Sequence, residues 1–186
     1  MQTFLVATGL VAVAEIGDKT QLLSLVLATR FRRPWPIVAG IAVATLLNHA
    51  AAAGVGAWIT AHVAPDVLRW ILGISFVAMA AWALVPDKLE DDPKQASRLG
   101  VFATTLVAFF LAETGDKTQV ATIALAAQQQ AAFLAVVAGT TLGMMIANVP
   151  VVFLGERLTR RLPLKTIRVV AAALFALMGV WIILRA

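Results

Sequence analysis

Long apolar runs separated by short polar stretches are the main pattern of the chain. Six runs are present: Phe4–Ala28, Ile37–Ala61, Val67–Val85, Leu99–Ala127, Ala131–Leu154 and Ile167–Leu184. Their lengths lie near the roughly 20 residues with which an α-helix crosses a bilayer. They lack the alternation of polar and apolar residues that marks a barrel strand. The pattern predicts an all-α integral membrane protein with six transmembrane helices.

Composition supports contact with a lipid bilayer. Of the 186 residues, 61% are hydrophobic and 13% are charged, whereas soluble domains are about 45–50% apolar. The chain has no cysteine, which excludes disulfide bonds. Its net charge of +5 could indicate a nucleic-acid surface. The basic residues gather in short loops, however, so we expect no nucleic-acid partner.

The basic residues also predict how the chain is oriented. Outside the two motifs described below, eleven Lys and Arg residues lie in or beside alternate loops, and two lie on the opposite side. The eleven are Arg30, Arg32, Arg33, Lys88, Lys94, Arg98, Arg157, Arg160, Arg161, Lys165 and Arg168; the two are Arg69 and Arg185. Because basic loops stay in the cytoplasm, both termini are expected outside it. The first residues lack the charged start of a signal peptide, so the first run is expected to be retained.

Charged residues interrupt the first and the fourth apolar runs at matching places. The first run contains Glu-Ile-Gly-Asp-Lys-Thr-Gln at residues 15–21, and the fourth contains Glu-Thr-Gly-Asp-Lys-Thr-Gln at residues 113–119. A charge at the centre of a bilayer costs from about 3 to more than about 10 kcal/mol, depending on the scale. Two such clusters predict a functional site within the membrane.

The two motifs belong to a longer internal repeat. The motifs are 98 positions apart, and after one inserted residue an offset of 99 aligns Val38-Ala39-Gly40 with Val137-Ala138-Gly139. We interpret the chain as a single transmembrane domain of two three-helix repeats, residues 1–86 and 99–186, joined by a cytoplasmic linker at 87–98. Because three is odd, the second repeat enters the membrane inverted. Inverted repeats are typical of secondary transporters, whose site lies near the midplane.

The motifs carry the residue types of a site for a hard divalent cation. Four acids and two lysines leave two net negative charges, which one divalent cation neutralises. Carboxylate, hydroxyl and amide oxygens suit Ca²⁺, Mg²⁺ and Mn²⁺. The candidate metal ligands are Glu15, Asp18, Glu113 and Asp116, the charge-balancing residues are Lys19 and Lys117, and the supporting candidates are Thr20, Gln21, Thr118, Gln119, Ser24 and Thr122.

Two backbone conformations are open at each motif. On a continuous helix Glu15, Asp18 and Lys19 share one face, whereas Gly17 could break the helix, as in transporters. Carboxyl groups buried together favour their protonated form, so cation and protons would compete for the same oxygens. The motifs therefore suggest an exchanger of cations for protons. Two Glu–Lys ion pairs that only lock helices together are the structural alternative.

Further polar residues inside the apolar runs have more than one interpretation. Asn48, His49 and Asn148 could relay protons or support a ligand, and interhelical hydrogen bonds explain them equally well. Met144 and Met145 could favour Mn²⁺ over Ca²⁺ through soft sulfur, although Met usually fills space. The sequence leaves these alternatives open.

The paired Glu-x-Gly-Asp-Lys-Thr motifs resemble the signature of a known family. This family of small membrane proteins includes the Golgi manganese/calcium transporter and bacterial manganese exporters. The resemblance covers essentially the whole chain, and both motifs match without departure. It implies a cation/proton antiporter that exports Mn²⁺ or Ca²⁺ from the cytoplasm, with the motif acids as ligands and no prosthetic group. The short chain resembles the bacterial branch, which implies manganese export across the cytoplasmic (inner) membrane of a bacterium.

Other functions remain as alternatives at this point. A membrane protease, a lipid phosphatase or another intramembrane metal-dependent hydrolase would use duplicated acids, but neither motif supplies an arginine and the chain has no Tyr. An exporter of a basic amino acid would use the same architecture, and a passive channel is a further alternative. A homo-oligomer is compatible with the sequence. The acidic run at 90–92 is either a solvated linker or a metal-sensing segment.

Overall fold

The computed structural model describes residues 1–85, 100–128, 132–155 and 163–184. Within these ranges the protein consists of helices and contains no strand, which confirms the predicted all-α class. The helices are α1 (Gln2–Glu15), α2 (Lys19–Phe31), α3 (Pro34–His62), α4 (Pro65–Ala83), α5 (Gly100–Glu113), α6 (Lys117–Gln128), α7 (Phe133–Leu154) and α9 (Leu164–Leu184). The predicted linker at 87–98 and its acidic run at 90–92 lie outside the described residues.

The first and the fourth apolar runs are each two helices rather than one. The chain leaves α1 after Glu15 and enters α2 at Lys19, and it leaves α5 after Glu113 and enters α6 at Lys117. The prediction of one continuous helix through each motif is therefore wrong, and the alternative of a break is correct. The cause is a glycine in the left-handed region at each break, Gly17 with φ 84° and Gly115 with φ 79°, a conformation that residues with a Cβ rarely adopt.

The other four runs correspond to α3, α4, α7 and α9, with ends within three residues of those predicted. These four helices are long and apolar enough to cross a bilayer, and α1 and α5 are shorter apolar helices. Large apolar side chains face outwards on several of them: Leu5, Trp58, Leu111 and Leu177 are each 60–66% exposed. An apolar exterior around buried charged groups is the arrangement expected of a protein surrounded by lipid.

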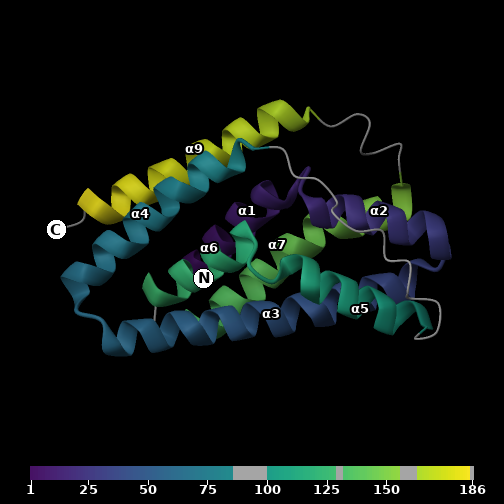
Figure 1. Ribbon diagram of the computed structural model, residues 1–186, viewed down its shortest axis with the longest axis horizontal. Coiled ribbons are helices and arrows are strands. Elements are labelled where there is room, and N and C mark those ends of the chain that lie inside the picture. The colour runs from purple at the N-terminus through teal and green to yellow at the C-terminus, as the bar shows by residue number, and fades with distance from the viewer. Residues whose placement is uncertain (86–99, 129–131, 156–162, 185–186) are drawn as a thin grey trace.

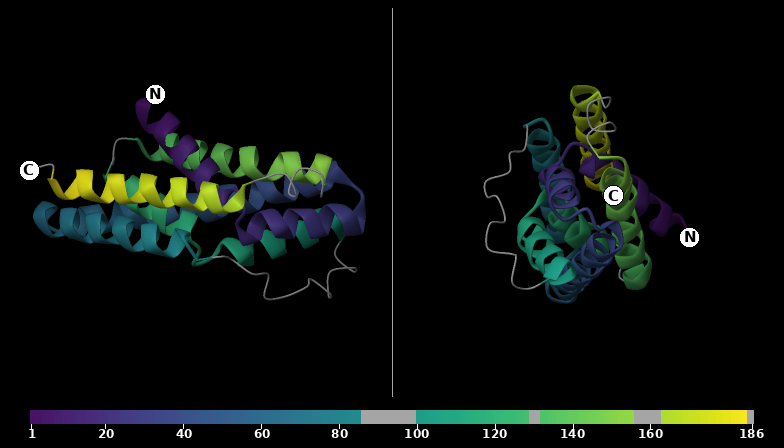
Figure 2. Two further views of the ribbon diagram at one scale, coloured as in Figure 1. Left: turned by 90° about the horizontal axis from the view of Figure 1, so that it is seen from above. Right: turned by 90° about the vertical axis from the view of Figure 1, so that its right-hand side faces the viewer.

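The broken helices pack against the two long helices α3 and α7 (Figures 1 and 2). Helix α1 lies along α7, α5 lies along α3, and α3 and α7 also contact each other. Helices α4 and α9 form a separate pair, side by side at an angle to α3 (Figure 1). This pair contacts the rest of the bundle mainly through α6 and α1.

Small residues set the spacing between the helices. A Cβ on Gly139 of α7 would lie 2.6 Å from the carbonyl oxygen of Phe4 in α1. A Cβ on Gly40 of α3 would likewise lie 2.9 Å from the carbonyl oxygen of Phe102 in α5. Such close backbone contact is typical of helix packing in membranes, where dispersion forces replace the hydrophobic effect.

Two glycines of α3 allow a matched test of this packing. A Cβ on Gly56 would lie 2.3 Å from the carbonyl oxygen of Ile123 in α6, whereas a Cβ on Gly54 meets nothing within 4 Å in the described structure. We expect Gly56→Ala to lower the free energy of unfolding by about 1–3 kcal/mol through overpacking. Gly54→Ala should be neutral or stabilise by up to about 1 kcal/mol through helix propensity. Thermal unfolding of the purified variants in detergent measures both, and equal effects would contradict the close α3–α6 contact.

Candidate metal site

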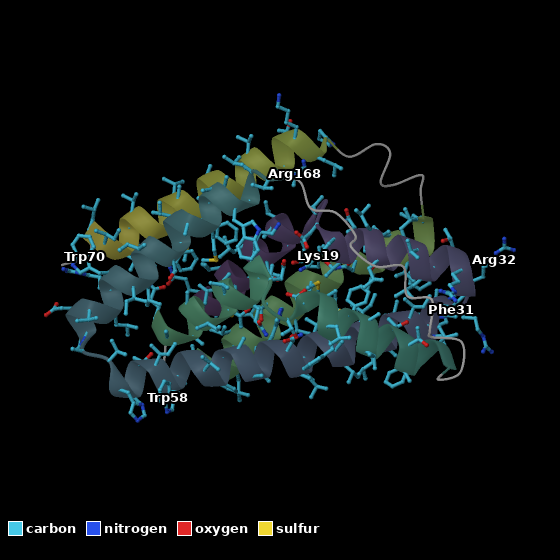
Figure 3. All side chains as sticks on the ribbon, viewed as in Figure 1. Lys19, Phe31, Arg32, Trp58, Trp70 and Arg168 are labelled. Carbon is cyan, nitrogen blue, oxygen red and sulfur yellow. The ribbon has the colours of Figure 1, made fainter. Side chains whose placement is uncertain are left out.

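The two helix breaks meet in the interior of the bundle. Glu15, Glu113 and Asp116 each have a carboxylate oxygen within 4.8 Å of the other two. All three side chains are buried, as is Asp18. Lys19, which begins α2, lies midway between the end that carries Arg32 and the end that carries Trp58 and Trp70 (Figure 3). The cluster therefore lies deep within the protein, away from both ends of the bundle.

Two ion pairs cross from one motif to the other. Lys19 Nζ lies 3.0 Å from Asp116 Oδ1, and Lys117 Nζ lies 2.7 Å from Asp18 Oδ1. The suggested Glu–Lys pairs are therefore wrong: the lysines contact the aspartates of the opposite motif. The reason is the break after each glutamate, which removes the shared helical face that would bring Glu15 to Lys19.

The glutamates instead accept hydrogen bonds from threonines of their own motifs. Thr20 Oγ1 donates to Glu15 Oε2 at 2.5 Å, and Thr118 Oγ1 donates to Glu113 Oε1. The second oxygen of each glutamate, Oε1 of Glu15 and Oε2 of Glu113, makes no hydrogen bond to any residue that the structure describes. These buried oxygens point to a cation because a carboxylate oxygen in a dry interior needs a donor or a positive charge.

The glutamines of the motifs form hydrogen bonds with the backbone at the two breaks. The backbone N–H of Gly17 donates to Gln21 Oε1 at 2.9 Å, and that of Gly115 donates to Gln119 Oε1 at 2.6 Å. At a helix break such N–H groups have no partner in the helix. Each glutamine oxygen thus uses one of its two lone pairs at the break, and a ligand role for these glutamines stays a prediction.

Each glutamine also ties its break to one of the long helices. Gln119 Nε2 donates to Asn48 Oδ1 on α3 at 2.6 Å, and Asn48 Nδ2 donates to the carbonyl oxygen of Phe110. Gln21 Nε2 donates to the carbonyl oxygen of Ala147 on α7 at 3.1 Å. Asn48 therefore acts through an interhelical hydrogen bond, one of the two alternatives that the sequence left open.

Several other candidates are engaged in structural contacts. Ser24 Oγ donates to Asn148 Oδ1 at 2.8 Å, and Asn148 Nδ2 lies 3.1 Å from the carbonyl oxygen and 2.9 Å from Sδ of Met144. Thr122 Oγ1 donates to the carbonyl oxygen of Thr118 in its own helix. Met145 packs at the edge of an apolar cluster. These contacts favour packing and hydrogen bonding over a ligand role for these side chains.

His49 lies beside the second motif. Its side chain is fully buried, and its Nε2 lies 3.6 Å from Glu113 Oε1. One turn earlier on the same face of α3, Thr45 is also buried and has no hydrogen bond from its Oγ1 to the described residues. Sequence analysis missed Thr45, although its i, i+4 spacing from His49 was a usable signal.

The surroundings of the two breaks differ. A Cβ on Gly17 would lie 2.8 Å from the side chain of Leu164 in α9, whereas a Cβ on Gly115 meets nothing within 4 Å in the described structure. Each lysine reaches the opposite motif: Lys117, which pairs with Asp18 beside Gly17, is 4% exposed, and Lys19, which pairs with Asp116 beside Gly115, is 27% exposed. Within the described ranges, the site is therefore covered more completely around Gly17 than around Gly115.

The fold and the site together define a class of protein. Helices long enough to cross a bilayer, broken helices that meet in the interior, and a buried acidic cluster with open oxygens are the features of membrane ion transporters. The sequence pattern of the family described as "Divalent cation/proton antiporter GDT1" matches residues 3–91 and 101–186. The chain therefore belongs to the GDT1 family of divalent cation/proton antiporters.

Two relatives are similar over nearly their whole lengths. A protein of Vibrio cholerae serotype O1 named "Putative manganese exporter" is 51% identical over 179 residues, which cover 96% of this chain and 89% of the relative. A Synechocystis protein named "GDT1-like protein sll0615" is 31% identical over 190 residues, which cover 92% of this chain and 91% of the relative. No solved structure matches the chain.

Family membership confirms the predicted resemblance and the predicted exchange of divalent cations for protons. The protein is a multi-pass membrane transporter and not an enzyme, so the hydrolase alternatives are wrong. The same finding rules out the alternatives of a basic amino acid exporter and a passive channel.

The crossed ion pairs generate a stability prediction. We expect Lys117→Met to lower the free energy of unfolding by about 3–5 kcal/mol, because Asp18 then stays buried without this countercharge. Lys19→Met should cost less, since the Lys19 side chain is 27% exposed and its ion pair is partly solvated. Adding Asp18→Asn to Lys117→Met should recover part of the loss. Thermal unfolding in detergent measures all three, and equal losses for the two lysine variants would contradict the difference in burial.

Proposed function

We propose that this protein exports a divalent cation, Mn²⁺ above all, from the cytoplasm in exchange for protons. Glu15, Glu113 and Asp116 bind the cation in this proposal, and Asp18, which is buried and pairs with Lys117, stays the fourth predicted ligand. The observation that carries it is the approach of these three buried carboxylates to within 4.8 Å of one another. Oxygen ligands around a hard divalent ion at about 2.0–2.6 Å have this spacing.

The charges of the site support exchange. Asp18 and Asp116 form ion pairs with Lys117 and Lys19, so the net charge of the cluster resides on Glu15 and Glu113. Either one divalent cation or two protons neutralise it. Because both compete for the same buried oxygens, binding of one favours release of the other.

The preference for Mn²⁺ rests on a relative: the Vibrio cholerae protein with 51% identity is named "Putative manganese exporter". A carboxylate-rich site is compatible with Mn²⁺, as it is with Ca²⁺ and Mg²⁺. Ca²⁺ is the second candidate because its coordination likewise uses carboxylate oxygens.

The architecture in this proposal is two inverted repeats, residues 1–86 and 99–186, joined by the linker at 87–98. The pairs α1–α2 and α5–α6 each cross the membrane once, which with α3, α4, α7 and α9 makes six spans. Repetition of the contacts at fixed offsets supports the two repeats. Gly40 faces the Phe102 carbonyl as Gly139 faces the Phe4 carbonyl, and the bond of each motif's glycine N–H to its glutamine recurs in the other motif.

The proposed location is the cytoplasmic (inner) membrane of a bacterium, with both termini outside the cytoplasm. A bacterial relative and the excess of Lys and Arg in alternate loops support this location and orientation. The start of α1 and the end of α9 both lie towards the end of the molecule opposite Arg32, which is consistent with a shared side (Figures 2 and 3).

The absence of cysteine makes this orientation directly testable. Single cysteines would be introduced as Ala64→Cys between α3 and α4 and as Arg33→Cys between α2 and α3. We expect a membrane-impermeant maleimide to label Ala64→Cys in intact cells, and to label Arg33→Cys only after permeabilisation. The reverse pattern would overturn the proposed orientation and leave the site unaffected.

Transport by the purified protein tests the exchange itself. In proteoliposomes that contain a pH-sensitive dye, entry of Mn²⁺ is expected to raise the internal pH because protons leave. Glu15→Gln and Asp116→Asn should abolish both signals, a larger loss than the roughly 10–100-fold that removal of a supporting group causes. Both variants should still be folded in the membrane.

Asp66→Asn is the matched control, because Asp66 is an exposed acid in the first turn of α4. It should transport at the parent rate. Mn²⁺ entry without a change of internal pH would refute coupling to protons. Parent-like transport by Glu15→Gln would show that this carboxylate is not an essential ligand.

A further inference from the structure

The two long helices present different residues to the site at equivalent positions. The offset of 99 pairs His49 of α3 with Asn148 of α7, and Thr45 with Met144. On α7, Asn148 Oδ1 accepts a hydrogen bond from Ser24, and Nδ2 contacts the carbonyl oxygen and the sulfur of Met144. The polar atoms of Asn148 are thus satisfied within the protein.

On α3 the equivalent side chain is not satisfied in this way. The His49 side chain is fully buried, and neither ring nitrogen makes a hydrogen bond to the residues that the structure describes. Thr45 Oγ1, one turn away, also makes no hydrogen bond to the described residues. A buried polar group without a partner is unfavourable, so a feature of this kind marks a bound ion, a water or a functional role.

The position of His49 indicates what its ring can bind. Its Nε2 lies 3.6 Å from Oε1 of Glu113, the carboxylate whose second oxygen, Oε2, has no hydrogen bond to the described residues. Metal–ligand bonds of about 2.0–2.6 Å place neighbouring ligand atoms of one ion roughly 3–4 Å apart. The separation of the imidazole and the carboxylate is in this range, and it is too long for a hydrogen bond.

We propose that His49 contributes a nitrogen ligand on the Glu113 side of the site and thereby favours a first-row transition-metal ion over Ca²⁺. This inference rests on the proposed function and identifies the residue that selects among the cations. Ca²⁺ and Mg²⁺ take oxygen ligands, whereas imidazole binds transition metals. One nitrogen among carboxylate oxygens therefore raises the affinity for Mn²⁺ relative to Ca²⁺.

A spectroscopic experiment tests the nitrogen ligand on the unaltered protein. The chain has two histidines, and the other, His62, is exposed at the end of α3 with Nδ1 2.8 Å from the Trp58 carbonyl oxygen. Pulsed electron paramagnetic resonance of bound Mn²⁺ is expected to show coupling to nitrogen that changes when histidine is labelled with ¹⁵N. His49→Asn should remove this coupling and His62→Asn should retain it. Bound Mn²⁺ without histidine coupling would overturn the inference.

Selectivity provides the second readout. His49→Asn places at this position the residue found at the equivalent position of α7, an oxygen donor of smaller size. We expect the ratio of Mn²⁺ to Ca²⁺ affinity, measured by competition, to fall by at least about tenfold, with Ca²⁺ affinity unchanged or increased. His62→Asn should leave the ratio at the parent value. An equal fall for both ions would show a structural role and overturn the inference.

The two proposals fail in different ways. If the parent protein neither binds nor transports Mn²⁺, the proposed function fails. If the parent protein binds and exchanges Mn²⁺ with protons while its Mn²⁺ signal is insensitive to ¹⁵N-histidine, only the role of His49 fails. The measurement on the parent protein decides this even if His49→Asn does not fold.

Discussion

The ion pairs that cross between the two motifs are the interactions on which the rest of the structure depends. Four acids and two lysines lie together inside a helical bundle whose exterior is apolar. Isolated charges in such surroundings are very unfavourable. Lys19 with Asp116 and Lys117 with Asp18 compensate four of these charges across the interface between the motifs. The pairs therefore hold the two broken helices together and leave the glutamates as the groups that a cation can neutralise.

The remaining architecture keeps this cluster in place. Gly17 and Gly115 turn the backbone so that the acids face inwards, and Gln21 and Gln119 bond the freed N–H groups. The same glutamines reach α7 and α3, which pack closely through glycines. A site with so many fixed hydrogen bonds is preorganised, and its open oxygens are those of the carboxylates. This combination suits a transporter that must exchange one positive ligand for another without rebuilding its site.

The two motifs have nearly the same sequence, which makes the differences in their surroundings informative. The hydrogen bonds of the motifs repeat almost residue by residue, but several contacts beside the motifs do not. Leu164 covers the first break, and the second break has no counterpart among the described residues. His49 stands where the other half has Asn148, whose polar atoms are bonded. The duplicated motifs can thus provide the negative charge that both halves share. The residues that differ beside them, such as Leu164 and His49, can set the cation preference and the direction of transport.

The sequence alone determined the helical class, the places of the candidate site residues along the chain and the chemistry available to them. These properties follow from the lengths of the apolar runs, from charge placed where a bilayer penalises it, and from the repeated hexapeptide. Only the tertiary structure decided that Lys19 pairs with Asp116 rather than with Glu15, that Gln21 and Gln119 support the backbone, and that His49 faces Glu113. The members of the two ion pairs are 97 and 99 residues apart in sequence, so local spacing cannot choose these partners. They are fixed by how broken helices cross, and a single glycine with positive φ redirects every side chain that follows it.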